Sequence, residues 1–242
     1  MTGDDFMYSA DIHTHSIASG HATQSTITDL AKAAKVRGLS LLGVSDHAPS
    51  TMCAGTVSYF RSLSMAPKNR CGVDLLYGIE LNILDYTGRV DMDPVTLSGL
   101  DYAIASMHRP NIHPGTREEN TAAYIGAMKN PYVSVIGHCD DTHYPVDYEV
   151  LAEAAVSSHV LLEINDSSLS PDGYRGDTRN NIRTLLTLCR KLDHPILLSS
   201  DSHGTARVGD FSHIVPLLRE CDIPERLILN PDPVRLRRFI LR

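Results

Sequence analysis

Several histidines and carboxylates of this sequence stand directly after short apolar segments. One such segment ends in the residues Asp11–His15, and another ends in Ser199–His203. Side chains two residues apart in a strand point to the same face, so His13 and His15 could hold one cation between them. Such a pair is weak evidence when it stands alone, because a histidine at a strand end is more often a packing or hydrogen-bonding residue.

The same residue types recur after four other apolar segments, and packing alone explains this coincidence poorly. Those segments end at His47, Glu80, His108 and His138, and His21 follows the first pair in a loop. Crowded imidazoles and carboxylates would repel one another once charged, unless cations organised them. The sequence therefore predicts metal ligands at His13, His15, His21, His47, Glu80, His108, His138, Asp201 and His203.

The donor types restrict the metal. Neutral imidazole with carboxylate, and without thiolate, suits zinc, manganese or iron, so we expect two or three such divalent ions. Cys139 follows His138 directly, but strand alternation turns it away from the cluster. We expect Cys139 to pack in the core, with ligation as the weaker alternative.

The elements that position these residues can be read from apolar patterning. Seven short apolar segments are predicted to be buried strands: Met7–His13, Leu41–Asp46, Asp74–Glu80, Asp101–His108, Tyr132–His138, Val160–Asn165 and Pro195–Asp201. Amphipathic helices are predicted over Ser25–Arg37, Thr116–Met128, Tyr148–Ser157 and Thr178–Leu192. The segment Asn82–Gly99 predicts a hairpin and a short helix instead of a full crossover helix.

Alternating strands and helices predict an α/β protein with a parallel sheet, which at this length can close into a barrel. An open doubly wound sheet is the alternative, and the absence of a glycine-rich phosphate loop disfavours it. We expect residues 1–242 to form a single domain.

Composition excludes several classes of function. The formal net charge of −7 disfavours non-specific binding of nucleic acid. The five cysteines are scattered and odd in number, which disfavours a disulfide framework. The acidic N-terminus does not resemble a signal peptide, and no apolar run approaches the length of a membrane span. We therefore expect a soluble, cytoplasmic protein.

The ordered set of motifs resembles the PHP (polymerase and histidinol phosphatase) family, and in particular its stand-alone trinuclear phosphatases of the YcdX type. The resemblance rests on motifs at 11–16, 45–47, 78–82, 105–108, 137–138 and 200–203, with further similarity at 18–22, 162–168 and 228–230. It implies a distorted (β/α)7 barrel, a metal-dependent phosphatase activity and a homotrimer.

The resemblance also implies a division of ligands among three ions. One ion would take His13, His15, Glu80 and Asp201; a second would share Glu80 and add His108 and His138; a third would use His21, His47 and His203. A metal-bound hydroxide would then attack the phosphorus of a small phosphorylated substrate, with Glu80, Asp201 and His203 as catalytic residues. Histidinol phosphate is one substrate that family relatives use.

Other residues are candidates for supporting roles. Arg109, Arg175 and Arg179 are predicted to bind the substrate phosphate, because a guanidinium matches two of its oxygens. His113 and His143 are candidates for substrate contact, whereas His159, His194 and His213 are expected at the surface. Asp11 and Asp46 are expected either to orient imidazoles or to cap backbone at the strand ends.

Two other functions remain open at this point. The same metals in a barrel could serve an amidohydrolase-like enzyme that cleaves a bond other than a phosphate ester. A nucleic-acid-processing PHP module is the other, disfavoured by the lack of a polymerase segment and of a basic stripe.

Overall fold

The computed structural model describes residues 8–241, and its centre is a parallel sheet of seven strands curved into a nearly closed barrel. The strands run in the order β1 (Ala10–Asp11), β3 (Leu41–Val44), β5 (Val73–Asn82), β6 (Tyr102–Ser106), β7 (Val133–Ile136), β8 (Leu161–Asn165) and β9 (Ile196–Ser199). The short β4 (Asn69–Arg70) pairs with β5 in the antiparallel direction. Each of the seven predicted segments holds one barrel strand; the predicted start of the first, Met7, lies outside the described residues.

The seam between β9 and β1 is bridged by side chains and by a second small sheet. The Asn230 side chain donates to the carbonyls of Ala10 and Leu198 (2.9 and 2.7 Å) and accepts from the Leu198 amide. Above the seam, β2 (Thr14–His15) pairs in parallel with β10 (Ser202–His203). This pairing sets His15 beside His203 in register, so closure of the barrel also brings two predicted ligands together.

Two apolar cores lie on the two faces of the sheet. The inner core fills the barrel with side chains such as Ile12, Leu76 and Tyr102, and the outer core lies between the strands and the helices. The ring of Tyr102 lies so close to Gly78 that a Cβ there would be 2.4 Å from it. Along β5 the inward positions continue from Leu76 to Glu80, so strand alternation carries this carboxylate inside the barrel.

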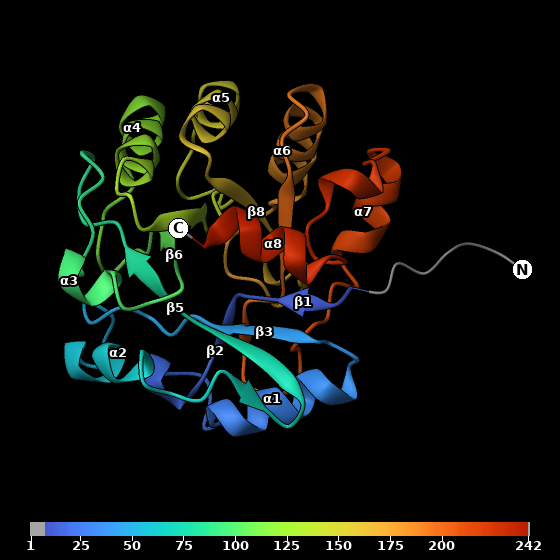
Figure 1. Ribbon diagram of the computed structural model, residues 1–242. Helices are drawn as coiled ribbons and strands as arrows, with labels where there is room; N and C mark the ends of the chain where they lie inside the picture. Colours follow the sequence, from blue (N-terminus) through green and yellow to red (C-terminus); the bar gives the residue numbers. More distant parts are fainter. Residues whose placement is uncertain (1–7, 242) are drawn as a thin grey trace, which may run out of the picture.

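Helices surround the sheet (Figure 1). They are α1 (Ile27–Val36), α2 (Val57–Leu63), α3 (Pro94–Leu97), α4 (Arg117–Met128), α5 (Tyr148–Ser158), α6 (Arg179–Lys191), α7 (Ile214–Glu220) and α8 (Pro233–Ile240), with 3-10 turns at Ile17–Ser19, Ser167–Leu169 and Glu225–Leu227. Helix α8 contributes Leu236 and Ile240 to the inner core, which closes the barrel opposite the site. No helix in the described part of the chain is long and apolar enough to cross a membrane.

Two of the predicted helices begin at a capping box. Thr116 and Glu119 form one at the start of α4, where the predicted helix begins, and Thr26 and Asp29 form the other at the start of α1. The segment after β5 forms the predicted hairpin through the Ile83–Val90 bridge and then the short α3.

Candidate metal centre

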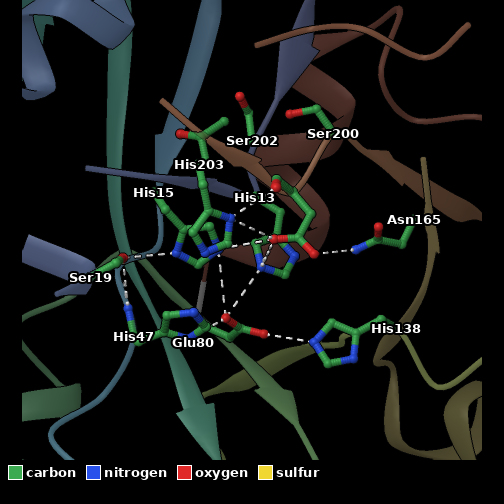
Figure 2. A network of polar contacts seen from close by, with 12 residues as sticks. His13, His15, Ser19, His47, Glu80, His138, Asn165, Ser200, Ser202 and His203 are labelled. Atoms are coloured by element: carbon green, nitrogen blue, oxygen red, sulfur yellow. Dashed lines mark hydrogen bonds and ion pairs between the residues drawn. The ribbon is translucent and has the colours of Figure 1, made fainter. Parts of the chain in front are cut away.

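The nine predicted ligands lie at the carboxyl end of the barrel strands. Figure 2 shows Glu80 among labelled members of this set, which are His13, His15, His47, His138 and His203. One of the Glu80 oxygens, Oε2, is 2.7 Å from His47 Nδ1, 3.5 Å from His13 Nε2 and 3.6 Å from His15 Nε2. The other, Oε1, is 2.9 Å from His138 Nε2 and 3.3 Å from His108 Nε2. Each oxygen therefore faces its own set of imidazoles, as a bridging carboxylate would.

Asp201 forms a second negative centre beside Glu80. Its Oδ1 lies 3.2 Å from His15 Nε2 and 3.7 Å from His13 Nε2, and its Oδ2 accepts a hydrogen bond from Arg175 at 2.8 Å. Both partners of the Arg175–Asp201 pair are 4% exposed. The guanidinium thus holds one oxygen of Asp201 while the other faces the histidines.

His203 and His21 complete the outer part of the cluster. The ring of His203 stacks on His15 with a centroid distance of 4.1 Å, and His21 stacks on His47 at 4.9 Å. Donor atoms of His15, His47 and His203 lie within 4.8 Å of one another, as do those of two sets around Glu80. His21 is more exposed than the other imidazoles and lies outside these three tight groups of the described residues.

In three of these histidines, the ring nitrogen that faces away from the centre is held by a hydrogen bond. His13 Nδ1 donates to Glu163 Oε1 (2.5 Å), and His108 Nδ1 lies 2.7 Å from Asn82 Oδ1. His15 Nδ1 lies 2.9 Å from the Ser19 hydroxyl. Such contacts fix the ring orientation and leave the opposite nitrogen with a free lone pair, which is the usual arrangement of histidine ligands.

The inward-facing atoms approach one another closely without forming hydrogen bonds. His13 Nε2, His15 Nε2, His203 Nε2, His47 Nδ1 and Glu80 Oε2 are buried and make no hydrogen bond in the described part of the protein. Buried polar atoms without partners are costly, and so many in one place require a common explanation. Several of their separations, near 3.5 Å, are those expected between ligands about 2.0 to 2.2 Å from a shared ion. The residues present therefore fit divalent cations.

The electrostatics suit cation binding. Burial by itself would raise the pKa of Glu80, but the surrounding histidines hold this pKa well below its ordinary value. Burial lowers the pKa of His15 well below its ordinary range and that of His108 to about 4. His13 is the exception: the charges of Glu163, Glu80 and Asp201 overcome burial and raise its pKa. The cluster thus combines ionised carboxylates with mostly neutral imidazoles.

Two of the predicted ligands have unusual backbone conformations. His138 and Asp201 have positive φ angles of 28° and 51°. A non-glycine residue in this region is uncommon and is often found at functional sites, where the surrounding structure holds it. Here the Glu163 carboxylate accepts the His138 backbone N–H at 2.7 Å, so one side chain supports both His138 and His13.

A cavity of about 740 Å³ opens above the cluster. Among its lining residues are His21, His47, His108, Asp201 and His203, together with Arg109, Asp141, His143, Tyr174 and Arg175. Residues of the cluster therefore line the same cavity as two of the three arginines predicted to bind phosphate and one of the two candidate histidines.

Arg179, His113 and His194 do not lie where the sequence predicted them. Arg179 is an exposed residue of α6 that pairs with Glu220 and does not line the cavity, so its predicted contact with substrate is not supported. His113 is exposed outside the cavity lining, and only its carbonyl contacts Tyr86. His194, expected at the surface, is buried against the Val160 carbonyl.

Asp11 and Asp46 cap the ends of strands, which was one of the two roles expected for them. Asp11 accepts from the Ser200 hydroxyl and the Gly209 amide (2.5 and 2.8 Å). Asp46 accepts from the amide and hydroxyl of Ser16 (2.6 and 2.7 Å). Cys139 is buried in the outer core, as the packing prediction requires.

Sequence reasoning gave no role to Glu163, Asn82 and Ser19, the side chains that orient the imidazoles. For Glu163 a signal was present, because it is a charged residue inside the buried apolar segment Val160–Asn165. A carboxylate at a fully buried strand position needs a partner, and the partner here is a proposed ligand.

Comparisons with known proteins agree with this geometry. The chain is 39% identical over 233 residues to a probable phosphatase of Clostridium novyi, which covers 96% of this chain and 94% of the relative. It is 37% identical over 234 residues to a probable phosphatase of Citrobacter koseri, with 97% and 94% covered.

A solved structure shares the fold. The histidinol phosphate phosphatase of Lactococcus lactis, crystallised with zinc, L-histidinol and phosphate, superposes with a TM-score of 0.61 at 17% identity, covering 90% of this chain and 95% of that one. Finally, the family model of the PHP domain matches residues 11–167, from Asp11 at the seam to the turn after β8. Together with its relatives, this match shows that the chain belongs to the PHP domain family.

Proposed function

We propose that this PHP-family chain is a metal-dependent phosphatase that hydrolyses the monoester of a small phosphorylated molecule. The observation that carries the proposal is the set of unpartnered imidazole and carboxylate atoms around Glu80, found in a chain that matches probable phosphatases over nearly its whole length. We propose zinc, manganese or iron as the ions, two or three in number. Zinc is the first to test, since it is present in the structural relative from Lactococcus lactis.

Divalent ions in such a site supply a nucleophile at neutral pH and neutralise charge that develops on phosphate oxygens. The protein's part is to hold the donors in place. Glu80 and Asp201 would contribute the negative charge, and the seven imidazoles would contribute neutral donors. Glu163, Asn82 and Ser19 would keep three of the rings correctly turned.

Arg109 is the better candidate for a direct phosphate contact. It follows His108, lines the cavity and makes no ion pair or hydrogen bond with other described residues, so its donors are available. Arg175 differs, because its donors already contact Asp201, Tyr174, Ser168 and Asn165.

The test combines metal analysis with a substrate panel. Protein purified without chelators should contain more than one equivalent of transition metal and should hydrolyse phosphate monoesters in preference to amides and lactones. The Glu80→Gln protein, prepared in parallel, controls for contaminating phosphatases. The proposal would be contradicted if the metal content stayed well below one equivalent after zinc, manganese or iron was added. Activity confined to amides or lactones would contradict it as well.

A further inference from the structure

The cavity above the cluster is lined by one imidazole that is not a proposed metal ligand. The described histidines of its lining are His21, His47, His108, His203 and His143, and only the last lies outside the nine predicted ligands. The His143 side chain is 28% exposed, so it is accessible from the cavity. The proposed metal centre does not use this residue, although it lines the space that a bound ester would enter.

One ring nitrogen of His143 is held by a buried carboxylate. Nδ1 lies 2.7 Å from Asp141 Oδ1, and the His143 backbone amide donates to the same oxygen at 2.9 Å. An ionised carboxylate only accepts, so Nδ1 carries a proton and Nε2 is the nitrogen that gains and releases one. Nε2 makes no hydrogen bond with another described residue. His143 is therefore oriented as an acid–base group is, with one nitrogen fixed and the other free.

The loop around this pair is fixed at two points. The Asp141 amide donates to the carbonyl of the predicted ligand His138 at 3.2 Å, and the Tyr144 amide donates to the Asp141 carbonyl at 3.1 Å. The amide and hydroxyl of Thr142 donate to the Arg175 carbonyl at 3.1 and 2.7 Å. The pair is thus joined to the cluster through His138 and to the loop after β8 through Arg175, which restricts its movement.

Arg109, the candidate for a direct phosphate contact, lies near the same loop. Burial raises the pKa of the Tyr144 hydroxyl, and the charges of Asp141 and Arg109 shift it in opposite directions, so both charges lie close to this hydroxyl. Arg109 and His143 also line the same cavity. An ester whose phosphate lies between the cluster and Arg109 would therefore place its alcohol oxygen in the space that His143 lines.

Other proton-bearing side chains of the cavity are less suited to give a proton to that oxygen. Arg109 and Arg175 are guanidinium groups, which keep their protons in proteins. Tyr174 carries a phenol and Cys53 a thiol, and both groups are weaker acids than an imidazolium. The position and the chemistry of His143 thus agree.

We propose that His143 is the general acid of the phosphatase reaction and that Asp141 positions it. The inference rests on the proposed phosphatase function. A water oxygen bonds to phosphorus while the bond from phosphorus to the alcohol oxygen breaks, and the electron pair of that bond stays on the alcohol oxygen. His143 Nε2 gives its proton to this oxygen, so a neutral alcohol leaves. The water keeps one proton on the phosphate product and loses the other to solvent, from which His143 is protonated again.

The experiment compares n-propyl phosphate, whose alkoxide is strongly basic, with p-nitrophenyl phosphate, whose phenolate leaves without a proton. A general acid typically contributes about 10²- to 10⁴-fold to the rate. We expect His143→Ala to lower kcat/KM for the propyl ester about 100-fold or more, and for the nitrophenyl ester less than about tenfold. Added imidazole should restore part of the propyl activity, because it can enter the vacated space and donate a proton. Inhibition by n-propylphosphonate should be unchanged, since binding of the phosphate group does not use His143.

Two further variants complete the comparison. Asp141→Asn should lower the propyl rate selectively as well, because an amide no longer fixes the proton on Nδ1 of His143. His113→Ala is the matched control, since His113 is exposed and lies outside the cavity lining. It should leave the rates with both esters unchanged. Each variant should keep the metal content and the circular dichroism of the wild type.

Several results would overturn the proposal. Equal losses on the two esters in His143→Ala would remove the general acid and leave the phosphatase function standing, and so would a normal rate with the propyl ester. Loss of metal from His143→Ala would show that the residue supports the cluster instead. If His143→Ala does not fold, His143→Gln decides by the same comparison, because glutamine fills a similar space and cannot act as an acid. Failure of the wild type to hydrolyse any ester would overturn the proposed function together with this inference.

Discussion

Replacing Arg175 by methionine tests whether this residue positions Asp201 or binds substrate. The guanidinium and the carboxylate are 2.8 Å apart and both are 4% exposed. Removing one partner of a buried ion pair leaves an uncompensated charge and typically costs about 3–5 kcal/mol. Asp201 keeps a hydrogen bond from Asn165 at 3.2 Å, so we expect the lower end, a loss of about 3 kcal/mol from the free energy of unfolding of the metal-free protein.

The same variant should weaken metal binding, because Asp201 would lose the contact that turns its Oδ1 toward His13 and His15. Loss of a residue that orients a ligand typically lowers metal affinity about 10- to 100-fold. Urea unfolding followed by circular dichroism measures the stability, and competition with a fluorescent chelator measures the affinity. Arg175→Lys should fall between wild type and Arg175→Met, since lysine keeps the charge without the planar fork.

Arg179→Met is the matched control, because its partner Glu220 is exposed and surface pairs contribute little. A positioning role requires that Arg175→Met differ from this control in both stability and metal affinity. If the two variants behaved alike in both measurements, and Arg175→Met instead raised KM for phosphate esters, then Arg175 would be a substrate ligand and our reasoning would be wrong.

The remaining predictions concern charge inside the site. Glu80→Gln should lower kcat/KM by about 10²- to 10³-fold or more, because the charge shared by two sets of imidazoles is lost; near-normal turnover of the metal-replete variant would exclude a bridging role. Burial raises the pKa of Asp140 from 3.8 to about 6, so the folded form binds this proton more tightly than the unfolded form. Its contribution to stability is therefore largest below about pH 4 and is lost as the pH rises through about 6. In urea unfolding of metal-free protein, the free energy of unfolding should fall less for Asp140→Asn than for wild type as the pH rises over this window, with a difference of at most about 3 kcal/mol. Parallel pH profiles of the two proteins would contradict this.

The fold could largely be predicted from the sequence, because its signals are local. Strand alternation and the capping residue Thr116 lie within a few positions of the elements they define. The seam of the barrel could not be predicted in the same way. It depends on Asn230 reaching the carbonyl of Ala10, 220 residues earlier in the chain, and no local pattern records such a contact.

In the candidate site, too, local features could be predicted and contacts between distant segments could not. The residue types at the strand ends predicted which side chains come together, since parallel strands bring their carboxyl ends to one edge; that these side chains bind metal stays a prediction. The supporting contacts were missed because they join distant segments, as Glu163 does with His13, 150 residues apart. Arg179 was misplaced for a related reason: it opens α6, and the chain does not show locally that this turn faces Glu220 and not the cavity.

The balance of charge inside the barrel connects the fold to the proposed chemistry. Glu80, Glu163 and Asp201 are buried carboxylates whose pKa values are all lowered against the effect of burial. In the metal-free protein, Arg175 supplies one permanent positive charge among them, and protonated His13, whose pKa is raised, supplies a second, which His13 would lose on binding a metal ion. The other imidazoles of the cluster for which a shift is resolved, those of His15, His21, His108 and His203, all have lowered pKa values and remain neutral. Buried negative charge in excess of its partners is unstable in a low-dielectric interior. Divalent cations would neutralise this excess negative charge and would also bind the ring nitrogens that make no hydrogen bond. The same ions would therefore remove both sources of instability in the site.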